Sequence, residues 1–208
     1  MGKSATGKDH IYRELLQDES LRLFPLVLYT TRPMREGEQN GREYWFVDEA
    51  HLEALRRDGK IIEERVYDTV YGPWRYFTAD EGIDLERRDY LGIGTLESYR
   101  PLVRYFGQDA LVPLYIETED GIRLQRAMKR EAKQNPPKYD EMCRRFLADG
   151  EDFSEEKIAE AGITRRYPNN GELETCIHSV REAIREAVCS TAETEKNSPA
   201  GLYGEAEI

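Results

Sequence analysis

The sequence predicts an α/β fold, with a three-layer parallel-sheet core, a small mixed β subdomain and a helical lid. Three observations predict it. Helix-like segments alternate with short apolar runs of strand length along the chain. A glycine-rich loop at residues 2–8 opens the first helix. A strongly basic helical segment, residues 123–145, follows the last central strand and carries a net charge of +5 in an acidic chain.

The N-terminal elements follow from periodicity and turn residues. Ile11, Leu15 and Leu16 form an apolar stripe that predicts a helix over residues 8–17. Residues 31–42 are rich in turn formers and charge, which predicts a loop. Asp48 is a good N-cap for a helix that runs to Arg57. Strands are expected at residues 24–29 and 44–47.

The rest of the chain continues the alternation. Residues 60–67 and 70–77 predict a hairpin that turns at Asp68-Thr69, and Thr78 is expected to cap a short helix to about Arg87. Strands are expected at 90–93 and 111–116, and helices at 96–106, 120–133, 139–147 and 171–188. Asn135-Pro136-Pro137 separates the two lid helices.

The length of 208 residues predicts one domain with a small insertion. We expect this domain to span residues 1–189, with a small inserted β subdomain at about 32–80 and a helical lid at about 120–147. Residues 190–208 carry four glutamates and one lysine, which predicts a disordered acidic tail. The sequence leaves open whether the protein is a monomer or a homodimer.

Charge and apolar patterning exclude several classes of partner. The net charge of −11 disfavours nucleic acid, whose phosphates need a basic face. No apolar run approaches the roughly 20 residues of a membrane span, and the first residues contain no signal-peptide core. Three cysteines are a sparse, odd set that indicates a reducing, cytoplasmic location. The lid segment, by contrast, holds eight basic and three acidic residues, a net +5 that suits nucleotides.

The glycine-rich loop carries the clearest chemical signal. Gly2-Lys3-Ser4-Ala5-Thr6-Gly7-Lys8 matches the pattern G-x-x-x-x-G-K. In this pattern backbone N–H groups converge on phosphate oxygens, the helix N-terminus adds positive potential, and Lys8 reaches the β- and γ-phosphates. The pattern normally ends in Ser or Thr, whose hydroxyl binds Mg²⁺, but Asp9 follows here, and its carboxylate is a possible metal ligand.

A loop of this kind ordinarily follows a buried strand, whereas this sequence starts inside the loop. Either the fold lacks its first core strand, or the natural start lies upstream of Met1. We expect the second, because removing a central parallel strand would expose the core on both sides. An in-frame apolar stretch of about six residues upstream would supply that strand.

The order of four sequence blocks over residues 2–188 resembles the guanylate kinase family. The blocks are the glycine loop, Thr30-Thr31-Arg32-Pro33-Met34-Arg35-Glu36-Gly37-Glu38, Gly41-Arg42-Glu43-Tyr44-Trp45-Phe46-Val47, and Ile62-Glu63 with Val70-Tyr71-Gly72. The resemblance implies a kinase that moves the γ-phosphoryl of ATP onto a nucleoside monophosphate, GMP or dGMP first. It implies Mg²⁺ as the cofactor and Gly2 to Asp9 as the ATP-binding residues.

The residues in these blocks suit an acceptor nucleotide. Arg32 and Arg35 can fork onto one phosphate, and Tyr44 and Tyr71 can donate phenolic hydrogen bonds to it. Glu63 can accept from guanine N1–H and the 2-amino group together. Adenine offers no such pair of donors, so Glu63 is the candidate for base choice.

The resemblance implies that the lid supplies the catalytic cations. Arg123, Arg126 and Arg130 recur at helical spacing. Arg126, Arg130 and Arg145 fall where the family's lid arginines clamp ATP and the transferring phosphoryl, alongside Lys8. Such cations neutralise the charge that develops during phosphoryl transfer, where catalysis is mainly positioning and electrostatics.

Four positions depart from the family pattern. Gly92 and Gly94 stand where the family usually has two aspartates that help hold the Mg²⁺ water shell and the guanine. Pro73 replaces a Ser or Thr that assists base recognition, and Leu28 replaces a phosphate-binding Ser. Asp9, Asp89 or Glu97 are candidates to compensate for the lost carboxylates.

These departures keep two alternatives open. The acceptor could be another small phosphorylated molecule such as ribose 1,5-bisphosphate. Alternatively, the chain could be a non-catalytic module that binds phosphorylated partners through Arg32, Arg35, Tyr44 and Tyr71. Such a module would not need Lys8 or the lid arginines, which are all present. A GTPase is disfavoured, because no Asn-Lys-x-Asp motif occurs.

Overall fold

The structure is a computed structural model that describes residues 1–69 and 72–196. Its helices are α1 (Lys8–Gln17), α2 (Glu49–Arg57), α3 (Leu96–Phe106), α4 (Asp120–Glu131), α5 (Tyr139–Asp152), α6 (Glu155–Glu160) and α7 (Leu173–Lys196). Its strands are β1 (Leu23–Pro25), β2 (Tyr29–Thr30), β3 (Trp45–Phe46), β4 (Ile61–Thr69), β5 (Gly72–Ala79), β6 (Asp89–Leu91), β7 (Tyr115–Glu117) and β8 (Arg166–Pro168). The predicted α/β class with parallel pairing is confirmed, since β1 pairs with β6 and β7 with β8 in parallel.

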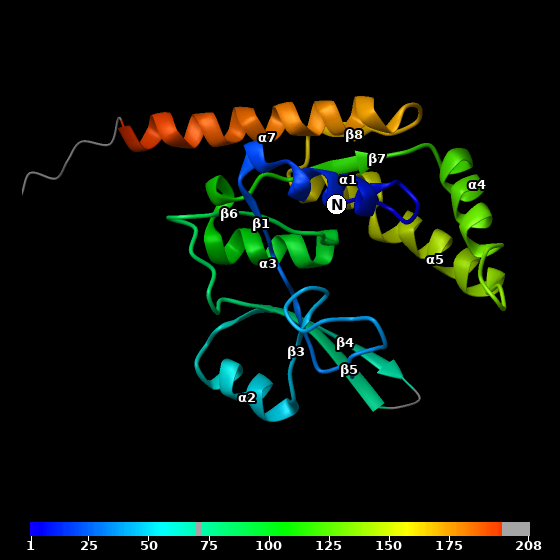
Figure 1. The fold of residues 1–208 in the computed structure, drawn as a ribbon, viewed down its shortest axis with the longest axis horizontal. Helices are drawn as coiled ribbons and strands as arrows, with labels where there is room; N and C mark the ends of the chain where they lie inside the picture. Colours follow the sequence, from blue (N-terminus) through cyan, green and yellow to red (C-terminus); the bar gives the residue numbers. More distant parts are fainter. Residues whose placement is uncertain (70–71, 197–208) are drawn as a thin grey trace, which may run out of the picture.

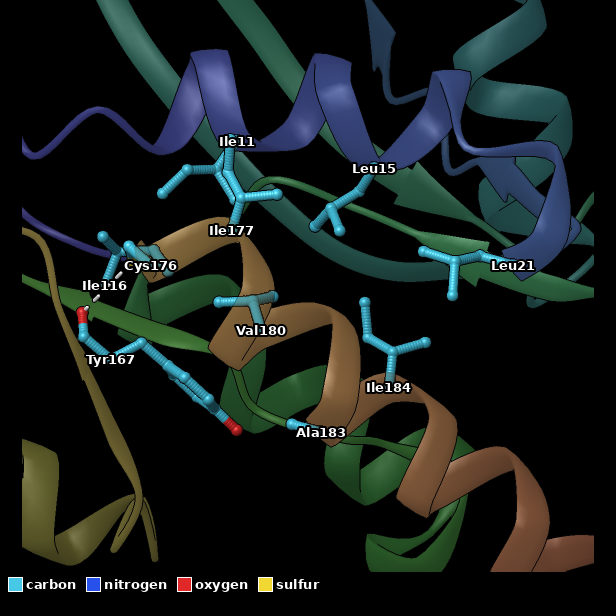
Figure 2. Packing of buried hydrophobic residues seen from close by; sticks show 10 residues of the cluster. All are labelled: Ile11, Leu15, Leu21, Ile116, Tyr167, Cys176, Ile177, Val180, Ala183 and Ile184. Carbon is cyan, nitrogen blue, oxygen red and sulfur yellow. Dashed lines mark hydrogen bonds between the residues drawn. The ribbon is translucent and has the colours of Figure 1, made fainter. Parts of the chain in front are cut away.

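The core is built where α1 packs against the long helix α7. Figure 2 shows Ile11 and Leu15 of α1 facing Ile177, Val180 and Ile184 of α7, with strands β7 and β8 closing the cluster below. All five of these side chains are at most 7 % exposed. In Figure 1 the helix α7 crosses the top of the molecule above β7, β8 and α1. This packing fixes the glycine loop, because α1 begins immediately after it.

The two parallel pairs form separate two-stranded sheets in the described part of the chain. The first residue lies alongside β7: the amine of Met1 donates to the Leu114 carbonyl at 2.6 Å, and Ile116 N–H donates to the Met1 carbonyl at 2.9 Å. This is the hydrogen-bond pattern of a parallel neighbour. A cavity of about 140 Å³ separates this edge from Leu26 and Leu91. The expectation of a further strand before the loop stays a prediction.

The lower part of the molecule is a four-stranded sheet in the order β3-β2-β5-β4 (Figure 1). The pair β4–β5 is antiparallel, so successive residues alternate between two faces. One face packs Phe77 and Ala79 against Leu52 and Leu55 of α2. The opposite face carries Glu63, which lies across from Thr78. The alternation therefore gives this sheet one apolar face and one polar face.

Helices α1, α2 and α3 match their predicted bounds, but several expectations need correction. The strand expected at 24–29 is divided into β1 and β2, which belong to different sheets, and of the strand expected at 111–116 only the last two residues lie in β7. Thr78 does not cap a helix: it lies inside β5, and residues 80–88 form turns. Asp68-Thr69 is not the hairpin turn, because strand β4 continues through Thr69, and Asp68 and Thr69 pair with Pro73 and Gly72. Residues 190–196, expected in a disordered tail, continue the backbone of α7. The remaining tail lies outside the described residues.

Besides two 3₁₀ turns at Glu19–Leu21 and Gln108–Ala110, two elements were not predicted, the short helix α6 and the strand β8. Both precede α7, in a segment where the sequence alternates too briefly to give a period. Over residues 1–69 and 72–196, no helix combines the length and the apolar character needed to cross a membrane.

Candidate active site

The glycine loop is held in a conformation that only glycine permits at two positions. Gly7 has φ 89°, and a Cβ there would lie 2.6 Å from Nδ2 of Asn169. Gly2 has φ 151°, and a Cβ there would lie 2.5 Å from the Ile116 carbonyl oxygen. Gly7 is also the N-cap of α1 and makes no side-chain cap, so the first N–H groups of the helix keep their hydrogen-bonding capacity. This is the geometry of an anion-binding helix N-terminus.

Buried hydrogen bonds anchor the loop to the strand ends of the core. The carbonyl of Thr6 accepts from Asn169 Nδ2 at 2.7 Å and from the Thr118 hydroxyl at 3.4 Å. Thr6 is 1 % exposed. Nζ of Lys8 donates back to the Lys3 carbonyl at 3.4 Å, so the lysine folds over its own loop. Sequence reasoning missed Asn169 and Thr118 because they act through a contact distant in the chain.

Arg123 ties the lid helices to the same loop. Its Nε donates to the Ser4 carbonyl at 3.0 Å and its Nη2 to Oδ2 of Asp149 at 2.8 Å. It also pairs with Asp120, and its guanidinium lies 4.6 Å from the ring centroid of Phe146. The same Asp149 oxygen accepts from Ser4 N–H at 2.7 Å. With its side chain 1 % exposed, Arg123 is a structural cation and not part of an exposed basic face.

The three predicted lid cations differ in their surroundings. Arg126 is half-buried, and its buried Nη1 has no hydrogen-bond partner among the described residues. Arg130 is exposed. Arg145 is exposed as well and lies 3.8 Å from Glu141 on its own helix. Arg126 is thus the lid arginine with an unused buried donor.

On the polar face of the β4–β5 sheet, Glu63 is 7 % exposed. Its Oε1 accepts from the Thr78 hydroxyl at 2.8 Å, and both its oxygens pair with Arg65. Arg65 lies opposite Tyr76 in the register. Pro73, by contrast, lies opposite Asp68 at the far end of the hairpin. The hydroxyl beside Glu63 therefore belongs to Thr78. The absence of a hydroxyl at Pro73 does not leave Glu63 without a hydroxyl partner.

Arg32 borders this face and is 3 % exposed. Its two terminal nitrogens donate to the two oxygens of Glu38, each at 2.8 Å, while its buried Nε has no partner in the described part of the chain. The hydrogen bonds from Arg32, and next from the Arg35 N–H, lower the pKa of Glu38 to about 2. The guanidinium also lies 5.5 Å from the Tyr44 ring centroid. Tyr44 in turn meets Tyr76 edge-on at 5.4 Å.

The structure therefore gathers Arg32, Tyr44 and Glu63 around one sheet face. The side chain of Arg35 is exposed on the loop, and Tyr71 lies outside the described residues. Burial raises the pKa of the Tyr44 phenol, so this hydroxyl keeps its proton at neutral pH and remains a donor.

The space at the two altered glycines is partly filled. A Cβ at Gly94 would lie 2.8 Å from the Ser98 hydroxyl, and one at Gly92 would lie 3.2 Å from Cδ2 of Leu26. Ser98 is itself fixed in a capping box with Thr95 at the start of α3. Asp9 is exposed in the first turn of α1. Nowhere in 1–69 and 72–196 do three or more His, Cys, Asp or Glu side chains gather as a metal site.

The glycine loop and the polar sheet face meet at the same cavity. Lys8 lines it from the loop, and Thr78 lines it from β5. Gly92, Gly94 and Ser98 line it as well. Of the residues predicted to hold the two substrates, Lys8 lines this cavity, whose wall also contains core side chains such as Ile11, Leu15, Ile116 and Val180.

Comparison with known proteins identifies the family. A family model described as guanylate kinase matches residues 1–76. The chain is 26% identical over 187 residues to the guanylate kinase of Porphyromonas gingivalis, covering 89% of this chain and 94% of that protein. It is 31% identical over 160 residues to a guanylate kinase of Thermus thermophilus, covering 76% of this chain and 60% of that protein.

Other matches are shorter or more distant. The guanylate kinase of Nitrosomonas europaea is 38% identical over 73 residues, which cover 35% of this chain and 36% of that protein. A crystal structure of guanylate kinase from Anaplasma phagocytophilum aligns with a TM-score of 0.52 at 20% identity, over 89% of this chain and 82% of that chain. This structural likeness supports the fold. Together with the glycine loop, the arginine–tyrosine block and Glu63, these matches show that the chain belongs to the guanylate kinase family.

Proposed function

We propose that this protein is an ATP-dependent kinase that transfers the γ-phosphoryl group to a nucleoside monophosphate, GMP or dGMP first. The observation that carries the proposal is the uncapped N-terminus of α1 behind the glycine loop, where Lys8 adds a positive charge. Lys8 belongs to the phosphate-binding loop, and Thr78 donates to the base-reading candidate Glu63.

The donor half rests on the loop at the N-terminus of α1. Free N–H groups and the helix dipole favour phosphate oxygens there, and Lys8 adds a full positive charge. The buried Nη1 of Arg126 lacks a partner among the described residues, and a phosphoryl oxygen would satisfy it. These groups neutralise charge on the transferring phosphoryl, which is the main task of a phosphotransferase site.

Asp9 is the residue that would hold Mg²⁺. The ion is usually bound through one or two carboxylates together with substrate phosphates, so a single carboxylate next to Lys8 fits it. When bound, Mg²⁺ supplies further charge neutralisation at the phosphates. Asp9 is exposed, and it therefore has room for the water ligands that Mg²⁺ retains.

The acceptor half rests on the polar sheet face. Arg32 offers its unpartnered Nε, and Tyr44 offers a protonated phenol, to the acceptor phosphate. Glu63 is the candidate acceptor of guanine N1–H and the 2-amino group. Thr78 and the strand register hold its carboxylate in place, so no reorganisation of the backbone is needed.

A second candidate acceptor is a small bisphosphorylated sugar such as ribose 1,5-bisphosphate. It is favoured by Gly92 and Gly94, which leave this side of the cavity without the family's two carboxylates. Removing negative charge from a pocket favours an acceptor that carries a second phosphate. The retained Glu63 favours the purine nucleotide instead.

The test is a coupled ADP-release assay with ATP and Mg²⁺, run over GMP, dGMP, AMP, UMP, CMP and ribose 1,5-bisphosphate. We expect turnover with GMP or dGMP that exceeds turnover with the other nucleotides. Turnover with the sugar bisphosphate alone would favour the second candidate. Binding of GMP with no turnover of any acceptor would contradict the kinase and support a non-catalytic binding module.

A further inference from the structure

Arg65 forms a two-point contact with the carboxylate that is proposed to read the base. Its Nε donates to Oε2 of Glu63 at 3.0 Å, and its Nη2 donates to Oε1 at 3.2 Å. The two side chains are 13% and 4% exposed. Residues 63 and 65 are two apart on β4, so strand alternation places them on the same face. The pair therefore sits within the polar face and not at its rim.

The geometry of this pair matches that of a bound guanine. The Nε–H and Nη2–H of an arginine are parallel donors on one guanidinium, and they engage both oxygens of a carboxylate at once. Guanine N1–H and its 2-amino group are likewise two parallel donors of one N–C–N unit. Each pair needs the same edge of the carboxylate. Arg65 and a guanine base therefore cannot make this contact with Glu63 at the same time.

Glu63 has little capacity left for a third partner. Oε1 already accepts from Nη2 of Arg65 and from the Thr78 hydroxyl, and Oε2 accepts from Nε. By contrast, the pairing of Arg32 with Glu38 leaves the buried Nε of Arg32 unpartnered among the described residues. The phosphate-binding arginine thus keeps a free donor, whereas the base-reading carboxylate has no unused edge.

We propose that Arg65 is a specificity-determining residue that occupies the guanine-reading edge of Glu63, so that GMP binds only by displacing it. The inference rests on the proposed function, because it concerns the acceptor of that reaction. Displacement costs affinity for GMP, and it sets the discrimination between purine acceptors. Arg65 acts on substrate choice by competing for Glu63.

The displaced guanidinium has a second carboxylate within electrostatic reach. Burial disfavours the charged form of Arg65, but the charge of Glu63 and its hydrogen bonds, with a smaller contribution from Glu97, outweigh burial, and the pKa of Arg65 is raised. Glu97 lies exposed in the first turn of α3. Glu97 can therefore share the charge of Arg65 when guanine takes Glu63.

Removing Arg65 should tighten GMP binding. In Arg65→Ala the buried carboxylate of Glu63 loses its arginine partner. A buried carboxylate without a cation is unfavourable until a new pair of donors binds it. Guanine supplies that pair. We expect the dissociation constant of GMP to fall by about tenfold, as one regained charge-assisted contact implies. Arg65→Lys keeps the charge but cannot fork, so its effect should be intermediate.

The experiment measures binding by titration calorimetry, without turnover, for GMP, IMP and AMP. IMP lacks the 2-amino group and offers Glu63 a single donor, and AMP offers neither N1–H nor that amine. We expect the gain from Arg65→Ala to be largest for GMP, smaller for IMP and absent for AMP. Arg75→Ala is the matched control, since Arg75 pairs with Glu64 on the opposite face of the sheet and Glu64 retains Arg56.

The outcomes separate this inference from the proposed function. Equal changes for all three nucleotides, or weaker GMP binding in Arg65→Ala, would overturn the role of Arg65. No binding of GMP by the wild type or either Arg65 variant would overturn it too. Tighter GMP binding without ADP release would support Arg65 and contradict the kinase. If Arg65→Ala fails to fold, the GMP-to-IMP ratio of Arg65→Lys gives the same test.

Discussion

The carboxylate of Glu38 accepts from both terminal nitrogens of Arg32, each at 2.8 Å. This contact fixes a guanidinium whose Nε has no partner among the described residues and lies beside Tyr44. Glu38→Gln has only one oxygen acceptor and cannot hold both nitrogens. We expect KM for GMP to rise by about tenfold while kcat changes less, because the lost contact positions the acceptor phosphate.

Steady-state kinetics of Glu38→Gln check this, with Glu43→Gln as the control on the same loop. Glu43 pairs with Arg42 at the surface, so its substitution should leave KM unchanged. An equal rise of KM in both variants would mean that the loop fold, and not the Arg32 contact, had been altered.

The same pair predicts a pH dependence of stability. The pKa of Glu38 falls from 4.5 to about 2 on folding, so the native state favours the ionised form. A depressed carboxyl pKa contributes stability above the unfolded value, and this stability is lost as pH falls toward the folded value. The difference in unfolding free energy between wild type and Glu38→Gln should be constant from pH 7 to about 5 and shrink between about 4.5 and 2. Denaturant titrations across this range measure it; a difference that does not change with pH would contradict the assignment.

Lys8 is predicted to act in phosphoryl transfer and not in folding. Its Nζ makes one long hydrogen bond, 3.4 Å to the Lys3 carbonyl, so its removal should cost little stability. Lys8→Ala should lower kcat by about a hundredfold or more, which is typical when a charge-stabilising donor is removed. Lys157→Ala, on the exposed surface of α6, is the charge-matched control. Activity of Lys8→Ala at the level of this control would remove the loop from the mechanism.

Arg123 is predicted to be structural. Its substitution by Met would leave Asp149 without its buried cation and remove the hydrogen bond to the Ser4 carbonyl. Breaking a buried pair in this way costs about 3–5 kcal/mol. Thermal and denaturant unfolding of Arg123→Met measure this loss of stability. The control is Arg144→Met, which removes an exposed lid arginine paired with Glu141 on its own helix. This control should lose less than about 1 kcal/mol of unfolding free energy. Equal stability of the two variants would contradict the anchoring role.

Local signals predicted the helices well. Asp48 and Thr95 cap α2 and α3 through their own side chains, and the apolar period of Ile11 and Leu15 sets the face of α1. These determinants lie within a few residues of one another, so the sequence alone contains them. Strands and turns were less predictable. Thr78 resembles a helix cap locally, yet pairing with Glu63 keeps it in β5, because strand partners are set by distant residues.

The candidate site divides in the same way. Lys8, Arg32 and Glu63 could be named from motifs, but the partners that decide their behaviour could not. Arg65 is the exception in principle: its i+2 spacing from Glu63 on a strand already places both on one face. Asn169 reaches Thr6 across 163 residues, and nothing local in the sequence indicates that contact.

The most direct test of the central claim is transfer of a radioactive γ-phosphoryl group from labelled ATP to GMP in the presence of Mg²⁺. The proposed function predicts labelled GDP with the wild type, a loss of labelling in Lys8→Ala, and no loss in Lys157→Ala. Labelled GDP from Lys8→Ala at the wild-type rate, or no labelled product while both ATP and GMP bind, would contradict it.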